Sequence, residues 1–337
     1  MRLQPQQPSV HGGAGAGIDL SASLNPLGPS PRALEAARSA RLDRYPEPDA
    51  RSLRLAAAAR HGVAADAVVP VPGAGFGLWL LAVALLKPGD RCVALGPCFG
   101  EYARSAAIAG AAYQEVRATE PNFAWDLDVL MTELCSGAAM CIVGNPGNPT
   151  GRAIAASDLR ELCSTQPATV FVVDEAFAAF GPGAISLLEG KLPPNAVVVR
   201  SLTKELGLPG LRMGYLIAEP TIASRLAGVM PPWPLSSTSI AAAVAGMEDL
   251  PHIERGASLA RVHIDRIAEG LRARDLNPVP TDANYLLVWA PTLTKALARR
   301  DITVRNCASF GLPVYVRIAA PTPADLPRVL DAIAEIE

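Results

Sequence analysis

Residues 196–212 read AVVVRSLTKELGLPGLR, and this stretch joins an apolar run to several polar groups. The apolar run predicts a buried strand, which ends at the hydroxyl of Ser201 and the amine of Lys204. A turn rich in glycine and proline then leads to Arg212. Lysine can form a Schiff base with pyridoxal phosphate (PLP), and serine and arginine can bind its phosphate. The S-x-x-K motif is short, so Lys204 taken alone is also compatible with a solvated loop lysine.

The bulk composition describes a globular chain without a strong electrostatic character. The chain has 337 residues, half of them hydrophobic, and a net charge of −2. This length suits two domains or one large α/β domain, and the charge gives no reason to expect nucleic acid or a membrane surface as a partner. No secretory signal or membrane span is apparent, and the six cysteines form no C-x-x-C pair. We therefore expect a cytoplasmic protein with reduced thiols and no metal site.

Short apolar runs alternate with helical patterns through the first two thirds of the chain. Strands are predicted at residues 68–71, 92–95, 140–143, 170–174, 197–201 and 213–217. Apolar strands separated by helices predict a mostly parallel sheet that is covered on both faces. Beyond residue 230 the pattern changes to a long helical stretch at 239–274, three short strands and a last amphipathic helix. We expect an N-terminal arm (1–30), a large cofactor-binding domain (31–230) and a small α+β domain (231–337).

Asp174 ends the apolar run of residues 170–173, where a carboxylate is costly to bury without a partner. A protonated pyridine nitrogen is such a partner, and this pairing makes PLP an electron sink. A magnesium-binding aspartate or a helix N-cap are the alternatives. The chain contains no G-x-x-x-x-G-K-[ST] sequence, which weighs against the magnesium alternative.

Three further motifs follow predicted strands. GAGFG at residues 73–77 offers free amides at a helix N-terminus for a phosphate, although a plain tight turn would look the same. NPGNPTG at 145–151 presents an amide side chain that can bind a ring hydroxyl, or forms two turns without a ligand. PCFGEY at 97–102 offers the aromatic face of Phe99 to a planar cofactor, or places that ring in the core.

The ordered set GAGFG, PCFGEY, NPGNPTG, VVDEAF, SLTK and GLRMGY, within residues 73–215, resembles the fold-type I, class I/II aminotransferase superfamily of PLP enzymes. The resemblance implies an α/β fold with a large, mostly parallel sheet flanked by helices and a smaller C-terminal α+β domain. It makes Lys204 the Schiff-base lysine and Asp174 the partner of the ring nitrogen. The residues it implies for binding the rest of the cofactor are Asn148 and Phe99 at the ring and Ser201, Arg212 and the amides of Gly75 and Phe76 at the phosphate.

The same resemblance assigns two residues that lie outside these motifs. Tyr45 would reach the cofactor phosphate of a neighbouring subunit, which implies a homodimer. Arg317 would bind the substrate carboxylate in a bidentate manner. One departure from the family pattern is Phe177, which stands where most members have a tyrosine that donates to the ring oxygen.

The N-terminal arm suggests a branch of the superfamily. HGG at residues 11–13, DLSASLNPLG at 19–28 and VRNCASF at 304–310 are similar to threonine-phosphate decarboxylases of cobalamin biosynthesis. This similarity predicts a lyase that decarboxylates L-threonine O-3-phosphate to (R)-1-amino-2-propanol phosphate, with His11 and Asn25 at the substrate. For His11, a flexible arm residue is the alternative. The alternative enzyme is an aminotransferase like histidinol-phosphate aminotransferase, with 2-oxoglutarate as acceptor, and a PLP-fold binding protein without catalysis is a third possibility.

Overall fold

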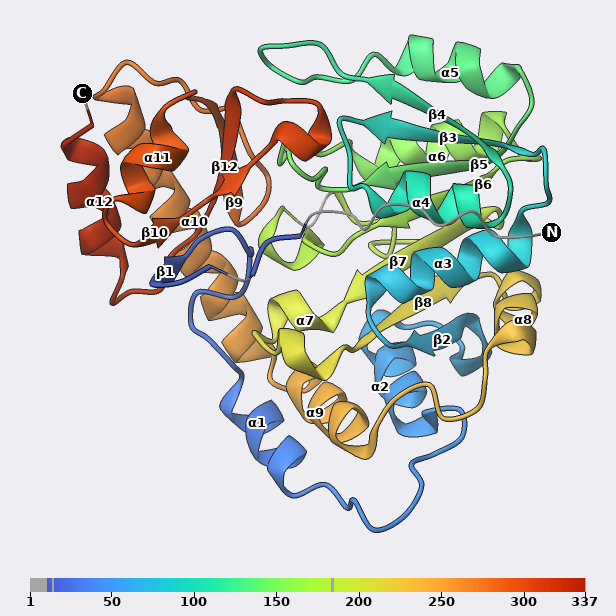
Figure 1. The fold of residues 1–337 in the computed structure, drawn as a ribbon. Helices are drawn as coiled ribbons and strands as arrows, with labels where there is room; N and C mark the ends of the chain where they lie inside the picture. The colour runs from blue at the N-terminus through green and yellow to red at the C-terminus, as the bar shows by residue number, and fades with distance from the viewer. Residues whose placement is uncertain (1–10, 14, 183–184, 337) are drawn as a thin grey trace.

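The structure is a computed structural model that describes residues 11–13, 15–182 and 185–336. Two sheets and the helices around them account for most of this part of the chain (Figure 1). The helices are α1 (Pro31–Arg38), α2 (Arg51–His61), α3 (Ala74–Leu85), α4 (Glu101–Ile108), α5 (Leu127–Cys135), α6 (Ala156–Thr165), α7 (Leu202–Glu205), α8 (Pro220–Val229), α9 (Ser237–Met247), α10 (Leu250–Arg272), α11 (Leu293–Ala298) and α12 (Leu326–Ala334). The strands are β1 (Ile18–Asp19), β2 (Val68–Val71), β3 (Arg91–Gly96), β4 (Ala112–Arg117), β5 (Ala138–Gly144), β6 (Val170–Asp174), β7 (Ala196–Ser201), β8 (Gly214–Ala218), β9 (Tyr285–Trp289), β10 (Ile302–Thr303), β11 (Arg305–Asn306) and β12 (Tyr315–Ala319).

The large sheet has the strand order β2-β8-β7-β6-β5-β3-β4. Strands β7, β6, β5, β3 and β4 are parallel, and β8 runs antiparallel to both of its neighbours. The prediction of a mostly parallel sheet is thus confirmed. The edge strand β4 (AYQEVR) was missed, because its side chains are mostly half-buried or exposed and lack the apolar run of the inner strands.

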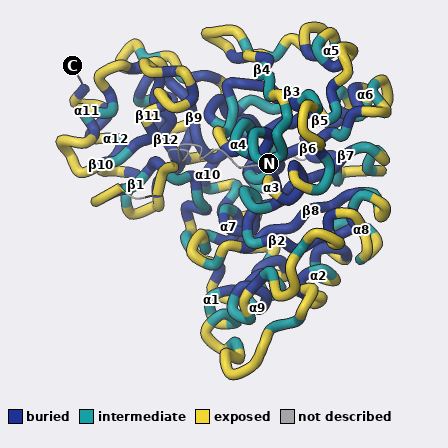
Figure 2. Tube along the Cα trace, turned by 45° about the vertical axis from the view of Figure 1, so that its right-hand side comes forward, coloured by how far each residue is buried: buried dark blue, intermediate teal, exposed yellow. Residues whose placement is uncertain are grey.

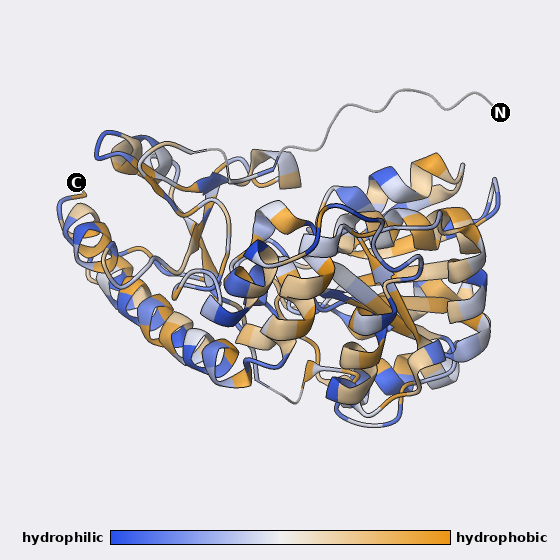
Figure 3. Ribbon diagram, turned by 90° about the horizontal axis from the view of Figure 1, so that it is seen from below, coloured by the Kyte–Doolittle hydropathy of each residue, from blue (hydrophilic) through white to orange (hydrophobic). Residues whose placement is uncertain are grey.

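Helices cover both faces of this sheet, and their apolar sides meet the apolar strands (Figure 3). On one face, α3, α4 and α8 pack on residues such as Val172 and Val197. The alternate residues Val173 and Val198 face α5 and α6 on the other side. The inner strands are therefore buried on both faces, and Figure 2 shows them as the continuous buried centre of the molecule.

The C-terminal part contains a three-stranded antiparallel sheet of order β11-β12-β9. The helical pattern predicted at 239–274 is divided into α9 and α10, and Pro251 lies in the first turn of α10, where its missing N–H is tolerated. Helix α9 packs on α1 and α2 of the large domain. The second half of α10 packs on β9, β12 and α12. The chain therefore changes from packing on the large domain to packing on the small sheet within α10. The boundary predicted near residue 230 comes before this point in the sequence.

The N-terminal arm runs along the small domain before it reaches the large one. Strand β1 pairs in parallel with β10, and the amide of Leu20 donates to the carbonyl of Thr303 at 2.7 Å. Residues 1–10 of the predicted arm lie outside the described residues. This pairing fixes the arm between the two domains, so that residues 11–13 and 19–24 can line the space between them. Within the described residues, no helix is long and apolar enough to cross a membrane.

Candidate active site

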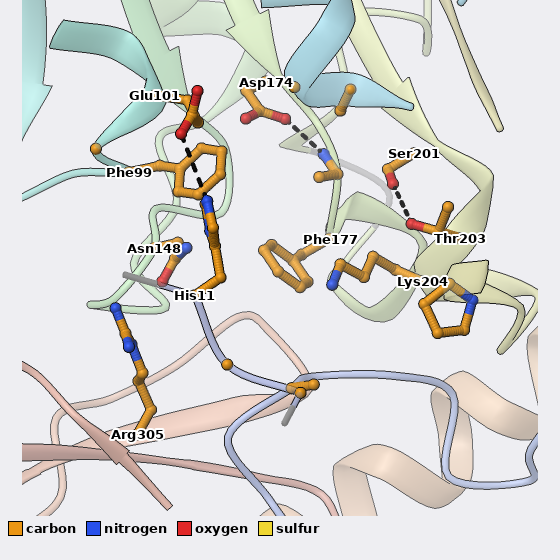
Figure 4. Close-up of a pocket in the computed structure, with 18 of the residues that line it drawn as sticks. His11, Phe99, Glu101, Asn148, Asp174, Phe177, Ser201, Thr203, Lys204 and Arg305 are labelled. Atoms are coloured by element: carbon orange, nitrogen blue, oxygen red, sulfur yellow. Dashed lines mark hydrogen bonds and ion pairs between the residues drawn. The ribbon is translucent and has the colours of Figure 1, made fainter. Parts of the chain in front are cut away.

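A cavity of about 1120 Å³ lies where β5, β6 and β7 of the large sheet end. Its walls come from the N-terminal arm, the strand ends, the start of α3 and the small domain. Ligands of open parallel sheets bind at this edge, because the loops that follow the strands meet there. Figure 4 shows Asp174, Asn148, Phe177 and Lys204 around the same space, with Arg305 entering from the small domain.

Lys204 stands in the short helix α7, directly after β7, and lines the cavity. The chain has four lysines, and the other three, Lys87, Lys191 and Lys295, are exposed. Burial, together with the nearby cations of Arg317 and Arg212, lowers the pKa of the Lys204 amine to about 8, although the Asp174 carboxylate opposes this shift. A neutral amine is the form that attacks a carbonyl, so the environment prepares Lys204 for that reaction.

The lowered pKa predicts how the uptake of PLP by the cofactor-free protein depends on pH. Only the neutral amine of Lys204 reacts, and its fraction rises as pH approaches a pKa of about 8. We expect the rate of uptake to rise about tenfold per pH unit below that value and to level off above it. Stopped-flow absorbance between pH 6 and 10 measures this rate. A rate that keeps rising to pH 10 would show an ordinary exposed amine.

Asp174 ends β6 and lines the cavity, where it is 7% exposed. Its Oδ2 accepts a hydrogen bond from the Tyr102 hydroxyl at 2.9 Å, and its Oδ1 accepts one from the amide of Ala176 at 3.1 Å. Burial nevertheless raises the pKa of the Asp174 carboxyl to about 6. A cation in the cavity would restore the charged carboxylate, and a protonated ring nitrogen is a cation of this kind.

The start of α3 forms an open cradle beside Ser201 and Arg212. Gly73 has φ +88, and a Cβ added there would lie 2.7 Å from Nη2 of Arg212, so glycine is needed at this turn. A Cβ added at Gly75 would meet nothing within 4 Å, which leaves room for a phosphate at the amides of Gly75 and Phe76. Ser201 Oγ lies 2.8 Å from the hydroxyl of Thr203, and all of these residues except Gly73 line the cavity.

Arg317 and Asn148 meet across the two domains. Arg317 donates from Nη1 to Asn148 Oδ1 at 2.5 Å and from Nη2 to the carbonyl of Ser21 at 2.6 Å. This leaves Nδ2 of Asn148 as a donor for a ring oxygen. Nε of Arg317 is buried and has no hydrogen-bond partner within the described part of the chain. A buried N–H of this kind is normally paired, so its state fits a site for an anion.

Aromatic rings form the remaining walls. The Phe177 ring packs edge-on against Tyr285, and its centre lies 5.8 Å from Nζ of Lys204. Phe99 lines the cavity beside His11, whose Nε2 lies 3.5 Å from Oε1 of Glu101 (Figure 4). The Lys204 amine, the Asp174 carboxylate, the open cradle and these flat walls together fit PLP.

Two predicted site residues do not line this cavity. Asn25 is 3% exposed, and its side chain donates to the carbonyl of Glu205 at 2.9 Å and accepts from the amide of Leu27 at 3.0 Å. It therefore supports the loop next to Lys204 instead of facing a substrate. Tyr45 lies in the loop between α1 and α2 and is 79% exposed. It stacks on Trp233 and does not line the cavity. The remaining predicted residues all contribute to the cavity, and their individual roles stay predictions.

Sequence analysis missed three residues that the fold brings to the cavity. Tyr102 comes from α4, 72 positions before Asp174, and Glu101 precedes it. Arg305 lies directly opposite Arg317 in the β11–β12 pair, so both side chains share one face of the small sheet. These residues belong to the motifs PCFGEY and VRNCASF, but long-range pairing decides which residues of each motif face the cavity. Within the described residues, no group of three or more His, Cys, Asp or Glu residues could hold a metal ion.

Comparison with known proteins supports the resemblance seen in the motifs. Residues 16–333 match the family model of aminotransferase class I and II. A histidinol-phosphate aminotransferase of Symbiobacterium thermophilum is 34% identical over 94% of this chain and 89% of its own length. The enzyme of the same name from Haloferax volcanii is 33% identical over the same shares. The crystal structure of histidinol-phosphate aminotransferase from Sinorhizobium meliloti, in complex with pyridoxal-5'-phosphate, superposes with a TM-score of 0.85 at 22% identity and covers 96% of this chain and 91% of that one.

These relatives correct the predicted reaction. Threonine-phosphate decarboxylation was the wrong interpretation, because relatives at 32–34% identity over most of the chain carry the name histidinol-phosphate aminotransferase. The arm motif misled because it serves the fold: Asn25 binds backbone groups, and its own amide donates to the carbonyl of Lys204 at 3.1 Å. In the second motif, Cys307 is buried and Asn306 accepts from the amide of Ala308. The side chains of Asn25 and Asn306 therefore bind backbone groups of this chain and carry no information about which substrate bond breaks.

Proposed function

Because the chain belongs to the class I and II aminotransferase family, we propose that it is a PLP-dependent aminotransferase that takes histidinol phosphate as amino donor and 2-oxoglutarate as acceptor. The observation that carries this proposal is Lys204, the single lysine of the chain that is not exposed, in one cavity with Asp174. Four arginines also line the cavity, Arg104, Arg212, Arg305 and Arg317, and they suit substrates that carry a phosphate or carboxylates. The lyase and cobalamin assignments are not part of this proposal.

The residues of the chain have separate tasks in this reaction. PLP, when bound, supplies the ring that accepts the electrons of the bond broken at the substrate Cα. Lys204 would hold the cofactor through Nζ, and the same amine is placed to move the proton at the substrate Cα. Asp174, supported by the Tyr102 hydroxyl, holds the proton on the ring nitrogen. Histidinol phosphate has no carboxylate on the carbon that bears its amine, so the C–H bond is the one that this arrangement breaks.

Arg317 and Arg305 are positioned to bind the anionic groups of the two substrates. Among the described residues, none pairs with the buried Nε of Arg317, and the guanidinium of Arg317 lies over the Tyr285 ring at 4.9 Å. Arg305 donates to Ser309 at 2.8 Å and lies over the Phe310 ring at 5.3 Å, so its planar group is held in one orientation. A phosphate and a 2-oxoglutarate carboxylate can each use such a planar donor, although not at the same time. His11 of the N-terminal arm also lines the cavity, and its imidazole is a third polar group there besides Arg317 and Arg305.

Replacing Arg305 with glutamine tests the substrate site. Loss of a charged hydrogen-bond donor costs about 1.5–3 kcal/mol, which corresponds to a rise of about 10–100-fold in the KM for histidinol phosphate. The value of kcat should change much less, since Arg305 does not reach the reacting carbon. Steady-state kinetics measures both values, with Arg299→Gln, an exposed arginine of the same domain, as the control. An unchanged KM would remove Arg305 from the substrate site.

The reaction itself is tested by incubating the PLP-loaded protein with histidinol phosphate and 2-oxoglutarate. The proposal predicts one glutamate for each histidinol phosphate consumed. A parallel reaction with threonine phosphate should release no CO2. If glutamate does not form with histidinol phosphate but forms with another amine, the family assignment stands and the substrate assignment fails.

A homodimer that shares its sites is part of this proposal. Tyr45 is remote from the cavity of its own chain but is held outward by its stacking on Trp233, at 4.8 Å between ring centres. A second copy of the chain can bring Tyr45 to the cofactor phosphate of the first. This arrangement explains an exposed aromatic pair on a protein of low charge.

Mixing two inactive variants tests the shared site. Tyr45→Ala and Lys204→Ala homodimers should both be weakly active or inactive. After subunit exchange, half of the dimers are hybrids, and each hybrid has one site with both residues intact. Activity should therefore return to about a quarter of the wild-type value at statistical mixing. No recovery, despite hybrids detected by native mass spectrometry, would place Tyr45 outside the partner's site.

A further inference from the structure

Each of three predicted cofactor residues has a charged neighbour in the sequence that faces away from the cavity. Asp174 is followed by Glu175, Ser201 is preceded by Arg200, and Lys204 is followed by Glu205. These three charged residues are 1–6% exposed, and none of them lines the cavity. Strand alternation explains the first two positions, because neighbouring residues of β6 and β7 point to opposite sides. The proposed site is thus backed by a layer of buried charges.

The buried charges form one connected network. Nη1 of Arg200 lies 3.1 Å from a carboxylate oxygen of Glu175, and Nη2 lies 3.4 Å from one of Glu205. Glu205 also binds Arg60 at 2.8 Å. Glu175 accepts hydrogen bonds from the Ser186 hydroxyl at 2.7 Å and the Leu187 amide at 2.8 Å. Arg200 is therefore the group that joins the residue after Asp174 to the residue after Lys204.

A backbone hydrogen bond also joins the ends of β6 and β7 beside the cavity. The amide of Glu175 donates to the carbonyl of Val199 at 2.9 Å, which holds the end of β6 against β7. Beyond that bond, the chain turns into α7, and no ladder hydrogen bond joins Asp174 to Lys204. The ion pairs of Arg200 with Glu175 and Glu205 join these two segments on the side that faces away from the cavity. Apolar residues of similar volume often stabilise a core as well as a buried ion network does, so stability alone does not account for the network.

We propose that Arg200 is a positioning residue that fixes the Lys204 amine relative to the Asp174 carboxylate by holding Glu205 and Glu175 at the same time. This inference rests on the proposed function in one respect: it takes Lys204 and Asp174 to be the residues that hold PLP. Arg200 does not touch the cofactor or the substrate. Its effect is on the separation and orientation of two groups that must act on the same small ring.

Arg200→Met and Arg200→Lys test this role, with two readouts that do not depend on turnover. The first is the Kd of the cofactor-free protein for PLP, and the second is the pH midpoint at which the absorbance of the lysine-bound cofactor changes. We expect Arg200→Met to raise the Kd about tenfold or more and to move the midpoint by about 0.5 pH unit or more. Arg200→Lys should recover most of both values, since it keeps the charge. The control is Arg91→Met, which removes the half-buried Arg91–Glu133 pair on the same sheet, away from the cavity, and should leave both values unchanged.

The alternative outcomes separate this inference from the proposed function. A folded Arg200→Met protein with the wild-type Kd and midpoint would overturn the positioning role and leave the proposed function intact. If Arg200→Met does not fold, Glu205→Gln keeps the shape of the side chain and weakens one of the two anchors; wild-type values in that variant would overturn the role equally. A wild-type protein that does not bind PLP through Lys204 would overturn the site and this inference together.

Discussion

Lys204→Ala is expected to lower kcat for amino transfer by at least about 10⁴-fold, because it removes both the Schiff-base amine and the group that moves the Cα proton. The purified variant should also lack the visible absorbance of a lysine-bound cofactor. Absorbance spectra and single-turnover kinetics with histidinol phosphate measure the two effects. Lys191→Ala, which removes an exposed lysine, is the matched control and should behave as wild type.

The result that would count against this assignment is a coloured Lys204→Ala protein with substantial turnover. Another amine would then have to hold the cofactor. The chain offers only Lys87, Lys191 and Lys295 besides Lys204, and all three are exposed. None of them lines the cavity that contains Asp174.

Asp174→Asn is expected to lower kcat by about 10²–10⁴-fold while PLP still binds. Breaking a buried charge pair costs about 3–5 kcal/mol, and here the cost falls on the state in which the ring must accept electrons. Asparagine can still accept the Tyr102 hydrogen bond, so the local geometry has a reason to persist. Kinetics on the PLP-loaded variant measures this loss, and a variant within tenfold of wild type would contradict the pairing of Asp174 with the ring nitrogen.

The cofactor-free form of Asp174→Asn should gain stability, although the PLP-loaded form loses activity. The folded pKa of Asp174, about 6, lies above its ordinary value of 3.8, so the wild type loses stability as pH rises from about 4 to 6. Asp174→Asn removes this loss. Its cofactor-free form should therefore be more stable than wild type by roughly 3 kcal/mol at pH 7, and the advantage should vanish near pH 4. Denaturant unfolding at both pH values measures the difference.

Much of the fold could be predicted because the buried strands appear in the sequence as short, almost wholly apolar runs. The runs at β2 and β6 were predicted with the observed bounds, since strands buried on both faces are apolar throughout. The site followed from topology: parallel strands collect their carboxyl ends at one edge, so Asp174, Lys204 and Asn148 had to come close together. The family resemblance, supported by relatives of 32–34% identity, added the same order of motifs.

The parts that could not be predicted depend on partners far away in the sequence. The pairing of Tyr102 with Asp174 and the placement of Arg305 opposite Arg317 arise from tertiary packing. The motif around Asn25 predicts substrate binding, although the Asn25 side chain hydrogen-bonds the backbone of Glu205 and Leu27. A polar residue in a noticed motif can serve the loop or the ligand, and only its hydrogen-bond partners distinguish the two.

Borohydride reduction followed by peptide mass analysis tests the central claim most directly. Reduction makes the bond between a lysine amine and PLP permanent, so the modified residue can be identified after proteolysis. The account predicts a phosphopyridoxyl group on the peptide that contains Lys204 and on no other. An unmodified Lys204 peptide, or the group on Lys87, Lys191 or Lys295, would contradict it.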